Sequence, residues 1–147
     1  MDKEEGTRYI VDTIPWVKQS GLCVEVFEPG HVKLMVPVAT HLNHVCIVYA
    51  GTHFMLMEVA GAALCMATYG IEEFVPLNKQ MTIRYHKPAM TDLTCELHLG
   101  ADEARTMLQP IRARGKGDWI MDMSVTDAGG SVVSTATCNY YLIPTPR

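Results

Sequence analysis

Six segments of the chain carry apolar residues in patterns typical of β-strands, and three others carry them at helical spacing. Turn residues separate neighbouring strands: Pro29-Gly30 lies between the first two, and Ala128-Gly129-Gly130 lies between the last two. These connections predict antiparallel pairing. The predicted strands cover residues 22–27, 31–37, 74–87, 91–100, 117–126 and 131–143, and the predicted helices cover 4–19, 51–69 and 101–110.

The central helix has the most unusual composition. It runs from Gly51 to about Tyr69, with Gly70 as its C-cap. Because it is apolar nearly all round, we expect it to be buried on most sides. Its length and apolarity also fit a membrane span, but Glu58 near its middle and the lack of flanking Lys/Arg bias argue against one. We therefore expect no membrane as a partner.

The other two helices are amphipathic or polar. The helix at 4–19 contains Pro15, where we expect a break or a kink. The helix at 101–110 has an acidic start, and its closing proline is expected to stop it. One buried helix among antiparallel strands predicts a single α+β domain over residues 1–147, in which a sheet of five to six strands wraps around the helix.

Composition and charge narrow the function classes. Hydrophobic residues make up 48% and charged residues 19% of the 147 positions, as in folded soluble domains. The formal net charge of −4 gives no reason to expect nucleic acid as a partner. The five cysteines are odd in number and form no CxxC pair, which favours a reducing compartment. The acidic segment Met1–Glu5 lacks an apolar stretch, so we expect no secretory signal and a cytoplasmic location.

Glu58 is the only formal charge between Val45 and Ile71. An ionised carboxylate in such apolar surroundings loses hydration, so its pKa should rise unless partners compensate. Titratable groups in such places are candidates for active sites. The alternative is that Glu58 faces solvent or fills a subunit contact.

The start of the same helix offers a second chemical feature, at Ala50 and Gly51. The first backbone N–H groups of a helix lack intrahelical partners and can hold an oxyanion that develops during acyl transfer. Gly51 and Glu58 are two turns apart, so they face the same side at a separation of about 10 Å. One carbonyl cannot contact both groups of one helix. Any such chemistry therefore predicts a homodimer in which two helices pack antiparallel and share their sites.

A longer motif contains these residues. The segment from Asn43 to Glu58 reads Asn-His-Val-Cys-Ile-Val-Tyr-Ala-Gly followed by Thr-His-Phe-Met-Leu-Met-Glu. It resembles the pattern Asn-x-x-Gly-x-x-His-Gly-Gly, with Asp or Glu seven residues later, of hotdog-fold thioesterases in the broad PaaI-like group. The strand that ends in Pro88-Ala89 and the turn at Asp127–Gly130 are also similar. The resemblance covers residues 20–143 and implies a hotdog fold and activity on acyl-CoA thioesters.

Three positions depart from the family pattern. Tyr49 replaces the usual histidine, Ala50 replaces the first glycine of the pair, and Cys46 replaces the earlier glycine. A backbone donor at Ala50 survives the methyl side chain. The form Tyr-Ala-Gly followed by Glu is typical of an uncharacterised branch of these proteins.

The resemblance implies roles for five residues. The amide of Ala50, together with that of Gly51, would polarise the thioester carbonyl. Asn43 would orient that carbonyl or the attacking water, and Glu58 would act as general base or nucleophile. Asn78 lies where the family often places a group that positions water, although it also reads as an ordinary polar residue at a strand start. The expected assembly is a homodimer or a dimer of dimers, with acyl-CoA as substrate and no metal or organic cofactor.

Two other functions remain open. The first is a hotdog module that binds acyl-CoA without turning it over. The second is a 3-hydroxyacyl-thioester dehydratase that uses His44 and Glu58, which are fourteen residues apart, as are the catalytic His and Glu of hotdog dehydratases. His41, His44 and His53 match no metal-binding spacing, so we interpret them as loop or core histidines.

Overall fold

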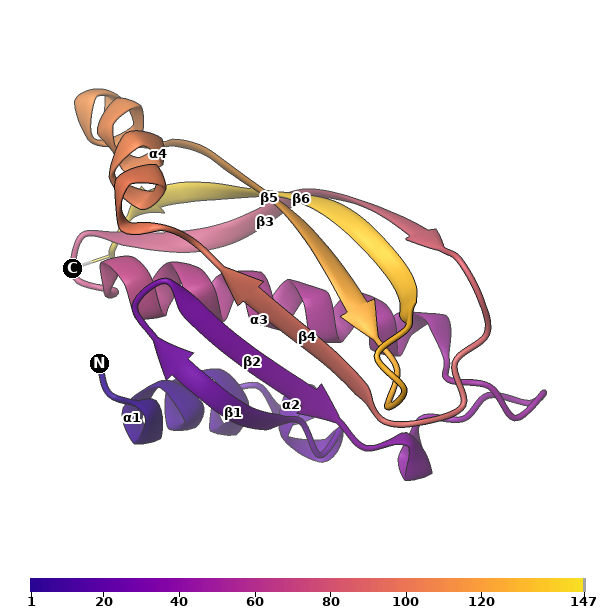
Figure 1. The fold of residues 1–147 in the computed structure, drawn as a ribbon. Coiled ribbons are helices and arrows are strands. Elements are labelled where there is room, and N and C mark those ends of the chain that lie inside the picture. The colour runs from indigo at the N-terminus through magenta and orange to yellow at the C-terminus, as the bar shows by residue number, and fades with distance from the viewer. Residues whose placement is uncertain (147) are drawn as a thin grey trace.

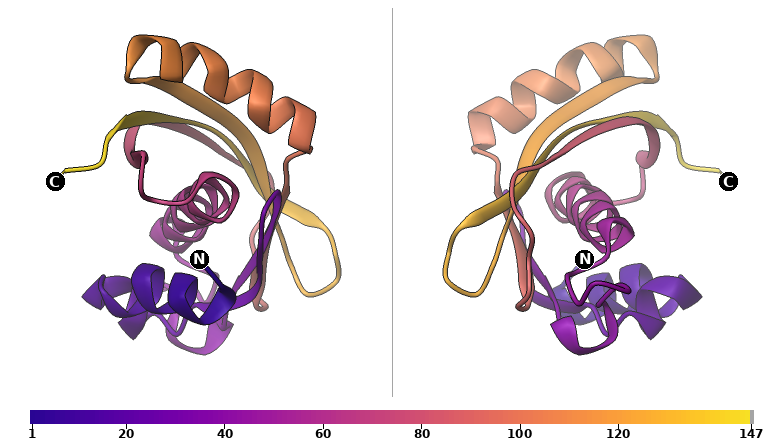
Figure 2. Two further views of the ribbon diagram at one scale, coloured as in Figure 1. Left: turned by 90° about the vertical axis from the view of Figure 1, so that its left-hand side faces the viewer. Right: turned by 90° about the vertical axis from the view of Figure 1, so that its right-hand side faces the viewer.

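The computed structural model describes residues 1–146, and Arg147 lies outside the described residues. One antiparallel sheet with strand order β1-β2-β4-β5-β6-β3 curves around a long central helix, α3 (Figures 1 and 2). This arrangement confirms the predicted α+β architecture, with six strands. The strands are β1 (Cys23–Glu28), β2 (His31–Val36), β3 (Phe74–Tyr85), β4 (Leu93–His98), β5 (Gly117–Thr126) and β6 (Val132–Pro144).

Helix α3 (Ala50–Tyr69) forms the core together with the inner face of the sheet. Apolar residues that alternate along the strands, such as Leu34, Cys95 and Val125, are fully buried on that face. Gly70 ends the helix as predicted, with a positive φ of 74° and its N–H bonded to the carbonyl of Met66. By length and composition α3 could cross a membrane, but 61% of its most apolar window is buried inside this fold.

The N-terminal segment lies along the side of α3 that faces away from β5 and β6 (Figure 2). It forms α1 (Lys3–Thr7), a π-helical turn (Arg8–Asp12) and α2 (Pro15–Gln19) rather than one helix. Pro15 occupies the first turn of α2, where its missing N–H costs no hydrogen bond. The predicted break therefore occurs, and it lies just before the proline.

Helix α4 (Ala101–Arg114) covers one end of the outer face of the sheet (Figure 1). The prediction that it stops at Pro110 is wrong, because the helix continues for one more turn. Pro110 removes one hydrogen bond, but burial of the neighbouring Leu108 and Ile111 favours continuation. The helix ends instead at Gly115, which has the left-handed conformation, with φ of 75°.

Candidate active site

The loop before α3 is organised by the side chain of Asn43. Its Oδ1 accepts hydrogen bonds from the backbone N–H groups of Val45 and Ile47, at 3.0 and 3.3 Å. Its own N–H donates to the carbonyl of Ile47, which closes the loop. Cys46 lies inside this turn with φ of 60°, so the family's glycine position requires a left-handed residue. The side chain of Asn43 thus shapes the loop through Oδ1, while its Nδ2 forms no hydrogen bond within residues 1–146.

Two backbone donors are free at the start of α3. The N–H of Tyr49 donates to the carbonyl of His41, and the N–H of Thr52 donates to the carbonyl of Tyr49. In the part of the chain that the structure describes, no carbonyl accepts from the amides of Ala50 or Gly51. The geometry that the oxyanion hypothesis needs is therefore present, with two adjacent amides at the positive end of a 20-residue helix.

Tyr49 and Tyr85 fix the surroundings of these amides. The ring of Tyr49 folds back over Gly51, where an added Cβ would lie 2.4 Å from Cε1 of the ring. The hydroxyl of Tyr85 donates to the carbonyl of Ala50 at 2.9 Å, which ties the helix start to the end of β3. A side chain at Gly51 would therefore displace the ring of Tyr49, although the backbone conformation at Gly51 suits any residue.

A cavity of about 350 Å³ opens beside the helix start. Asn43 and Ala50 line it together, so the structure brings these two predicted residues into one place. The N–H of Val48 donates to the carbonyl of Ala89 at 2.8 Å, and this bond holds the loop against the Pro88-Ala89 segment. The remaining lining comes mainly from the end of β3 and the segment after it.

His53 lines the same cavity, although the sequence analysis interpreted it only as a loop or core residue. It is 3% exposed, and its Nδ1 lies 2.8 Å from Oγ of Ser134, which is fully buried. Burial lowers the pKa of His53, so the neutral imidazole is favoured. Its position one turn after Ala50 was a usable sequence signal, because such residues share a helix face. Ser134 is 81 residues away, and no sequence pattern links it to this cavity.

Glu58 lies half-buried near the middle of α3. Burial raises the pKa of its carboxyl group, and the nearby side-chain amide of Asn78 offsets part of that rise. Cys138 on β6 is a further neighbour, since the charge of Glu58 helps to raise the pKa of its thiol. The hydroxyl of Tyr140 donates to the backbone carbonyl of Glu58 at 2.7 Å. The structure therefore brings Glu58 and Asn78 together.

Asn78 approaches the carboxylate from the inner face of β3, just before a β-bulge. Asn78 pairs with Tyr140, and Gln80 pairs with the next residue, Asn139, so Lys79 is an extra residue in the ladder. Before the bulge Asn78 shares the inner face, and after it the odd-numbered Met81 does. A strict alternation from Asn78 would have turned Gln80 inward in place of Met81.

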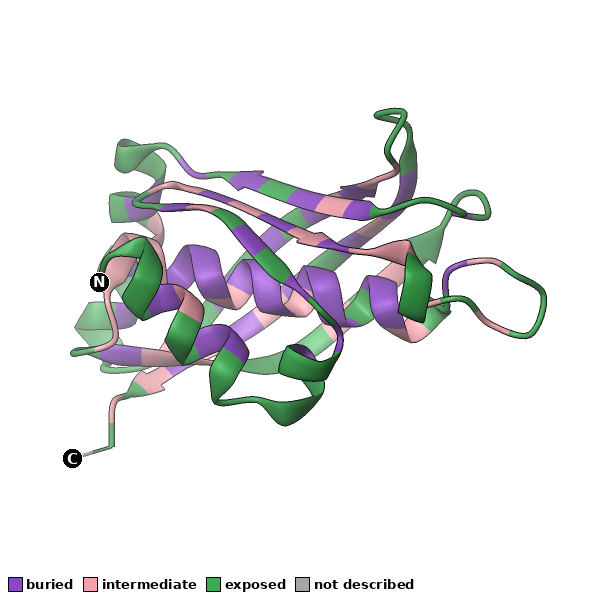
Figure 3. Ribbon diagram, turned by 90° about the horizontal axis from the view of Figure 1, so that it is seen from below, coloured by how far each residue is buried: buried purple, intermediate pink, exposed green. Residues whose placement is uncertain are grey.

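The two groups of candidate residues do not meet within one chain. Gly51, Phe54, Glu58 and Ala62 form a partly exposed stripe along α3. Figure 3 shows a largely buried central helix with less buried bands along its length. This stripe confirms that Gly51 and Glu58 face the same side. Helix geometry separates them by about 10 Å along the axis. Each chain thus carries two half-sites: a helix-start half (Asn43, Ala50 and Gly51) and a carboxylate half (Glu58 and Asn78).

The other two histidines of the sequence analysis lie outside these half-sites. His41 bridges two elements, with Nδ1 2.9 Å from Oγ1 of Thr52 and Nε2 2.7 Å from the carbonyl of Ser20. It is a satisfied structural residue. His44 is exposed on the loop.

Comparison with known proteins places this fold in a family. Residues 5–142 match the domain of unknown function DUF4442. A search of curated proteins finds no match. The chain is similar to a Pseudomonas aeruginosa protein of unknown function described as a probable thioesterase, at 34% identity and a TM-score of 0.91. That alignment covers 98% of this chain and 97% of the other.

More distant structures share the fold. A hypothetical thioesterase from Streptococcus pneumoniae, solved with coenzyme A, has 17% identity and a TM-score of 0.69, over 96% of this chain and 99% of its own. The Escherichia coli PaaI protein from the phenylacetic acid degradation operon has 16% identity and a TM-score of 0.71, over 95% and 92%. The chain therefore has the hotdog fold of these proteins and belongs to the family of the domain of unknown function DUF4442.

Proposed function

We propose that this protein hydrolyses acyl-CoA thioesters, as a member of the PaaI-like group in which Tyr-Ala-Gly replaces His-Gly-Gly. The observation that carries the proposal is the half-buried carboxylate of Glu58, which faces the same side of α3 as the free amides at Ala50 and Gly51. Acyl transfer needs both parts, a base or nucleophile and donors for the developing oxyanion.

Four of the candidate residues have a defined task in the proposed reaction. The amides of Ala50 and Gly51 bind the thioester oxygen as it gains negative charge. As general base, Glu58 takes a proton from water, whose oxygen attacks the carbonyl carbon. The C–S bond then breaks, the sulfur takes the proton from Glu58 and leaves as the CoA thiol, and the acyl group leaves as the carboxylic acid. Asn78 positions the water beside Glu58, and the raised pKa of Glu58 brings its basicity closer to neutral pH. No metal or organic cofactor takes part.

We further propose that two chains share each site. Strand β3 is an edge of the sheet, and within the described residues its backbone pairs with β6 alone. Leu77 on β3 and Phe54 on α3 are large apolar side chains with 50% and 39% of their surface exposed. A homodimer formed through this region would cover both. Antiparallel packing of two α3 helices would bring Glu58 of one chain to the helix start of its partner. A dimer of dimers would retain the same pairs.

The similar structures support the substrate class. The relative from P. aeruginosa at 34% identity is described as a probable thioesterase, and the more distant S. pneumoniae protein was solved with coenzyme A. We therefore place the CoA thioester, rather than a simple ester, first among the substrates.

One observation keeps the binding module as a second candidate. The ring of Tyr49 lies over Gly51, where the family has a histidine, and it narrows the approach to that amide. A hotdog protein that binds acyl-CoA without hydrolysis would show saturable binding and no release of thiol. The dehydratase has less support, because His53 rather than His44 lines the cavity beside the helix start.

Thiol release from a panel of acyl-CoAs tests the proposal. The panel includes acetyl, hexanoyl, dodecanoyl and phenylacetyl thioesters and is given to the wild type, Glu58→Ala and Glu103→Ala. Glu103 is an exposed carboxylate on α4 and serves as the matched control. We expect hydrolysis of at least one member, a loss of about 10²- to 10⁴-fold in kcat for Glu58→Ala, and no change for Glu103→Ala. Saturable binding without thiol release would contradict hydrolysis. Hydration of crotonyl-CoA that is lost in both His44→Ala and Glu58→Ala would indicate the dehydratase.

A further inference from the structure

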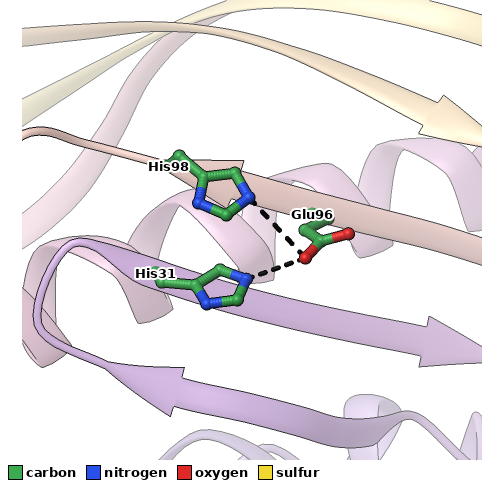
Figure 4. A group of neighbouring side chains, drawn as sticks. All are labelled: His31, Glu96 and His98. Carbon is green, nitrogen blue, oxygen red and sulfur yellow. Dashed lines mark hydrogen bonds and ion pairs between the residues drawn. The ribbon is translucent and has the colours of Figure 1, made fainter.

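Three side chains gather on the outer face of the sheet, which faces away from α3 and the candidate active site. His31 begins β2, and Glu96 and His98 lie two residues apart on the neighbouring strand β4. Val32 and Leu97, their neighbours in sequence, are buried on the inner face, so the three side chains point away from α3. Figure 4 shows them on the side of the strands opposite the helix.

Strand pairing brings the three groups to one point. His31 and His98 are direct partners in the β2–β4 ladder, and their rings stack with centroids 4.1 Å apart. Both rings turn Nε2 toward the carboxylate of Glu96, whose Oε1 lies 2.8 Å from His31 and 3.6 Å from His98. The three ligand atoms all lie within 4.8 Å of one another. Within residues 1–146, no other group of three or more His, Cys, Asp and Glu side chains brings its ligand atoms this close together.

We propose that His31, Glu96 and His98 form a binding site for a divalent transition-metal cation of the Zn²⁺, Ni²⁺ or Cu²⁺ type. Two imidazoles and one carboxylate suit these cations, whereas Mg²⁺ and Ca²⁺ prefer sites made of oxygen. Bonds of about 2.0–2.2 Å to a tetrahedral ion place ligand atoms roughly 3.4 Å apart. The two observed separations, 2.8 and 3.6 Å, lie on either side of that value.

Binding requires small movements of exposed side chains. Nearly parallel rings, at an interplanar angle of 17°, cannot both aim a lone pair at one ion, so the imidazoles must tilt toward each other. His98 is exposed and His31 is partly exposed, which leaves room for that rotation. The cation then takes the place of the hydrogen bond between His31 and the carboxylate of Glu96. The backbone stays fixed, because the ligands lie on paired strands.

One neighbouring charge opposes the cation. Lys33 is the direct partner of Glu96 across the strands, and the charges of the two side chains interact. Its ammonium group is held 2.9 Å from the carboxylate of Glu25 on β1, which draws it away from the cluster. Removal of this positive charge should therefore strengthen metal binding.

The site would fasten β2 to β4 without taking part in the proposed hydrolysis. The sheet lies between the cluster and Glu58, so the bound cation would stabilise the fold rather than activate water for the thioester. Binding to the folded chain alone raises the Tm by an amount that grows with cation concentration. We expect a rise of about 8 °C in 100 µM Zn²⁺ for a micromolar site.

Titration of the full-length, untagged chain with ZnCl₂ and CoCl₂ at pH 7.5 tests the site. All proteins carry Cys23→Ser and Cys46→Ser, because these exposed thiols could also bind the metals. The ligand variants are Glu96→Gln and His98→Gln, and the matched controls are Glu28→Gln and His44→Gln, exposed residues outside the cluster. Calorimetry gives affinity and stoichiometry, cobalt absorption reports the coordination geometry, and circular dichroism checks folding.

We expect one Zn²⁺ per chain, at least tenfold weaker binding in each ligand variant, and unchanged binding in each control. Lys33→Gln should bind Zn²⁺ several-fold more tightly, and MgCl₂ should not compete. No saturable binding at 100 µM Zn²⁺ would overturn the proposal. Binding that persists in both folded ligand variants would overturn it as well, since the cation would then lie elsewhere.

Discussion

The two halves of the candidate site lie on one helix but rely on different parts of the chain. The helix-start half offers backbone amides and is shaped by a loop that the side chain of Asn43 holds closed. The carboxylate half offers one side chain, Glu58, whose surroundings come from the inner faces of β3 and β6. The first half can therefore accept Ala50 in place of glycine, because its amide remains. The carboxylate half acts through the side chain of Glu58, so it does not tolerate a comparable replacement.

Their electrostatics differ as well. The free amides at Ala50 and Gly51 lie at the positive end of α3, where an anion is favoured. Glu58 lies two turns further on, beyond the reach of that end, so burial dominates and raises the pKa of its carboxyl group. One half is thus prepared to receive negative charge, and the other is prepared to accept a proton. Hydrolysis of a thioester needs both properties, and an antiparallel dimer would bring the two halves together.

Mixed dimers give the largest expected effect, because they test directly whether the two halves of one site come from different chains. Glu58→Ala removes the carboxylate half, and Gly51→Val removes the helix-start half, so we expect each homodimer to lose at least 100-fold in kcat. In a heterodimer of the two, one site combines an intact Glu58 with an intact Gly51 of its partner. Random mixing should therefore restore about a quarter of wild-type activity.

The measurement is thiol release after the two variants are unfolded together and refolded, with each variant refolded alone as the control. Activity that stays at the level of the single variants would mean that each site lies within one chain. A monomer in solution with full activity would contradict the shared site in the same way.

Gly51→Ala should have the next largest effect. Its Cβ would meet the ring of Tyr49 at 2.4 Å, and the exposed ring must move over the free amides. We expect kcat/KM to fall about 10- to 100-fold while the free energy of unfolding changes by less than about 1 kcal/mol, since alanine is the better helix former. The matched control is Gly100→Ala, where an added Cβ meets no atom within 4 Å. Equal activity in both variants would exclude Gly51 from the site.

The carboxylate half shows how far the sequence could lead. Glu58 was predictable as a special position because it is a lone charge in an apolar helix, and a single helix defines its side relative to Gly51. Its partner Asn78 came from the family resemblance alone. The bulge at Lys79, which turns Met81 inward after Asn78, follows from pairing with β6, and no local pattern in β3 reports it.

The helix-start half shows the same limit at longer range. The cavity beside Ala50 depends on Tyr85, on Ala89 and on the His53–Ser134 contact, whose partners lie far apart in sequence. Local patterns predicted the strands and the central helix because burial repeats with their periods. They failed at Pro110, where tertiary burial of Ile111 outweighs the loss of one helical hydrogen bond.

Asn78→Ala tests how the surroundings of Glu58 set the pKa of its carboxyl group. Hydrolysis requires ionised Glu58, so the rate should rise with pH through a pKa that burial places above 4.5. The side-chain amide of Asn78 lowers that pKa, and its loss should move the acid limb of the pH–rate profile to higher pH. Burial disfavours the charged form of Glu58 in the folded chain relative to the unfolded chain. The free energy of unfolding should therefore decline as pH rises through the pKa of Glu58.

The profile of kcat/KM between pH 4 and 8 checks this shift. Gln80→Ala is the control, because Gln80 lies on the other side of the bulge and is exposed. An unchanged acid limb in Asn78→Ala, with activity retained, would show that Asn78 does not act on the carboxylate.

Cys46→Gly should have the smallest effect and acts on the loop of the helix-start half. Cys46 has φ of 60°, a conformation that costs an L-residue about 1–2 kcal/mol. Glycine removes that cost. Its larger conformational entropy in the unfolded chain offsets part of the gain. We expect the free energy of unfolding in urea to rise by about 0.5–1 kcal/mol. Cys46→Ser keeps the left-handed strain and should show no gain, which separates the backbone effect from the thiol. Cys23→Gly, at the start of β1, should lose about 0.5–1 kcal/mol. Equal stability of Cys46→Gly and Cys46→Ser would mean that the Asn43 loop relieves the strain at no cost.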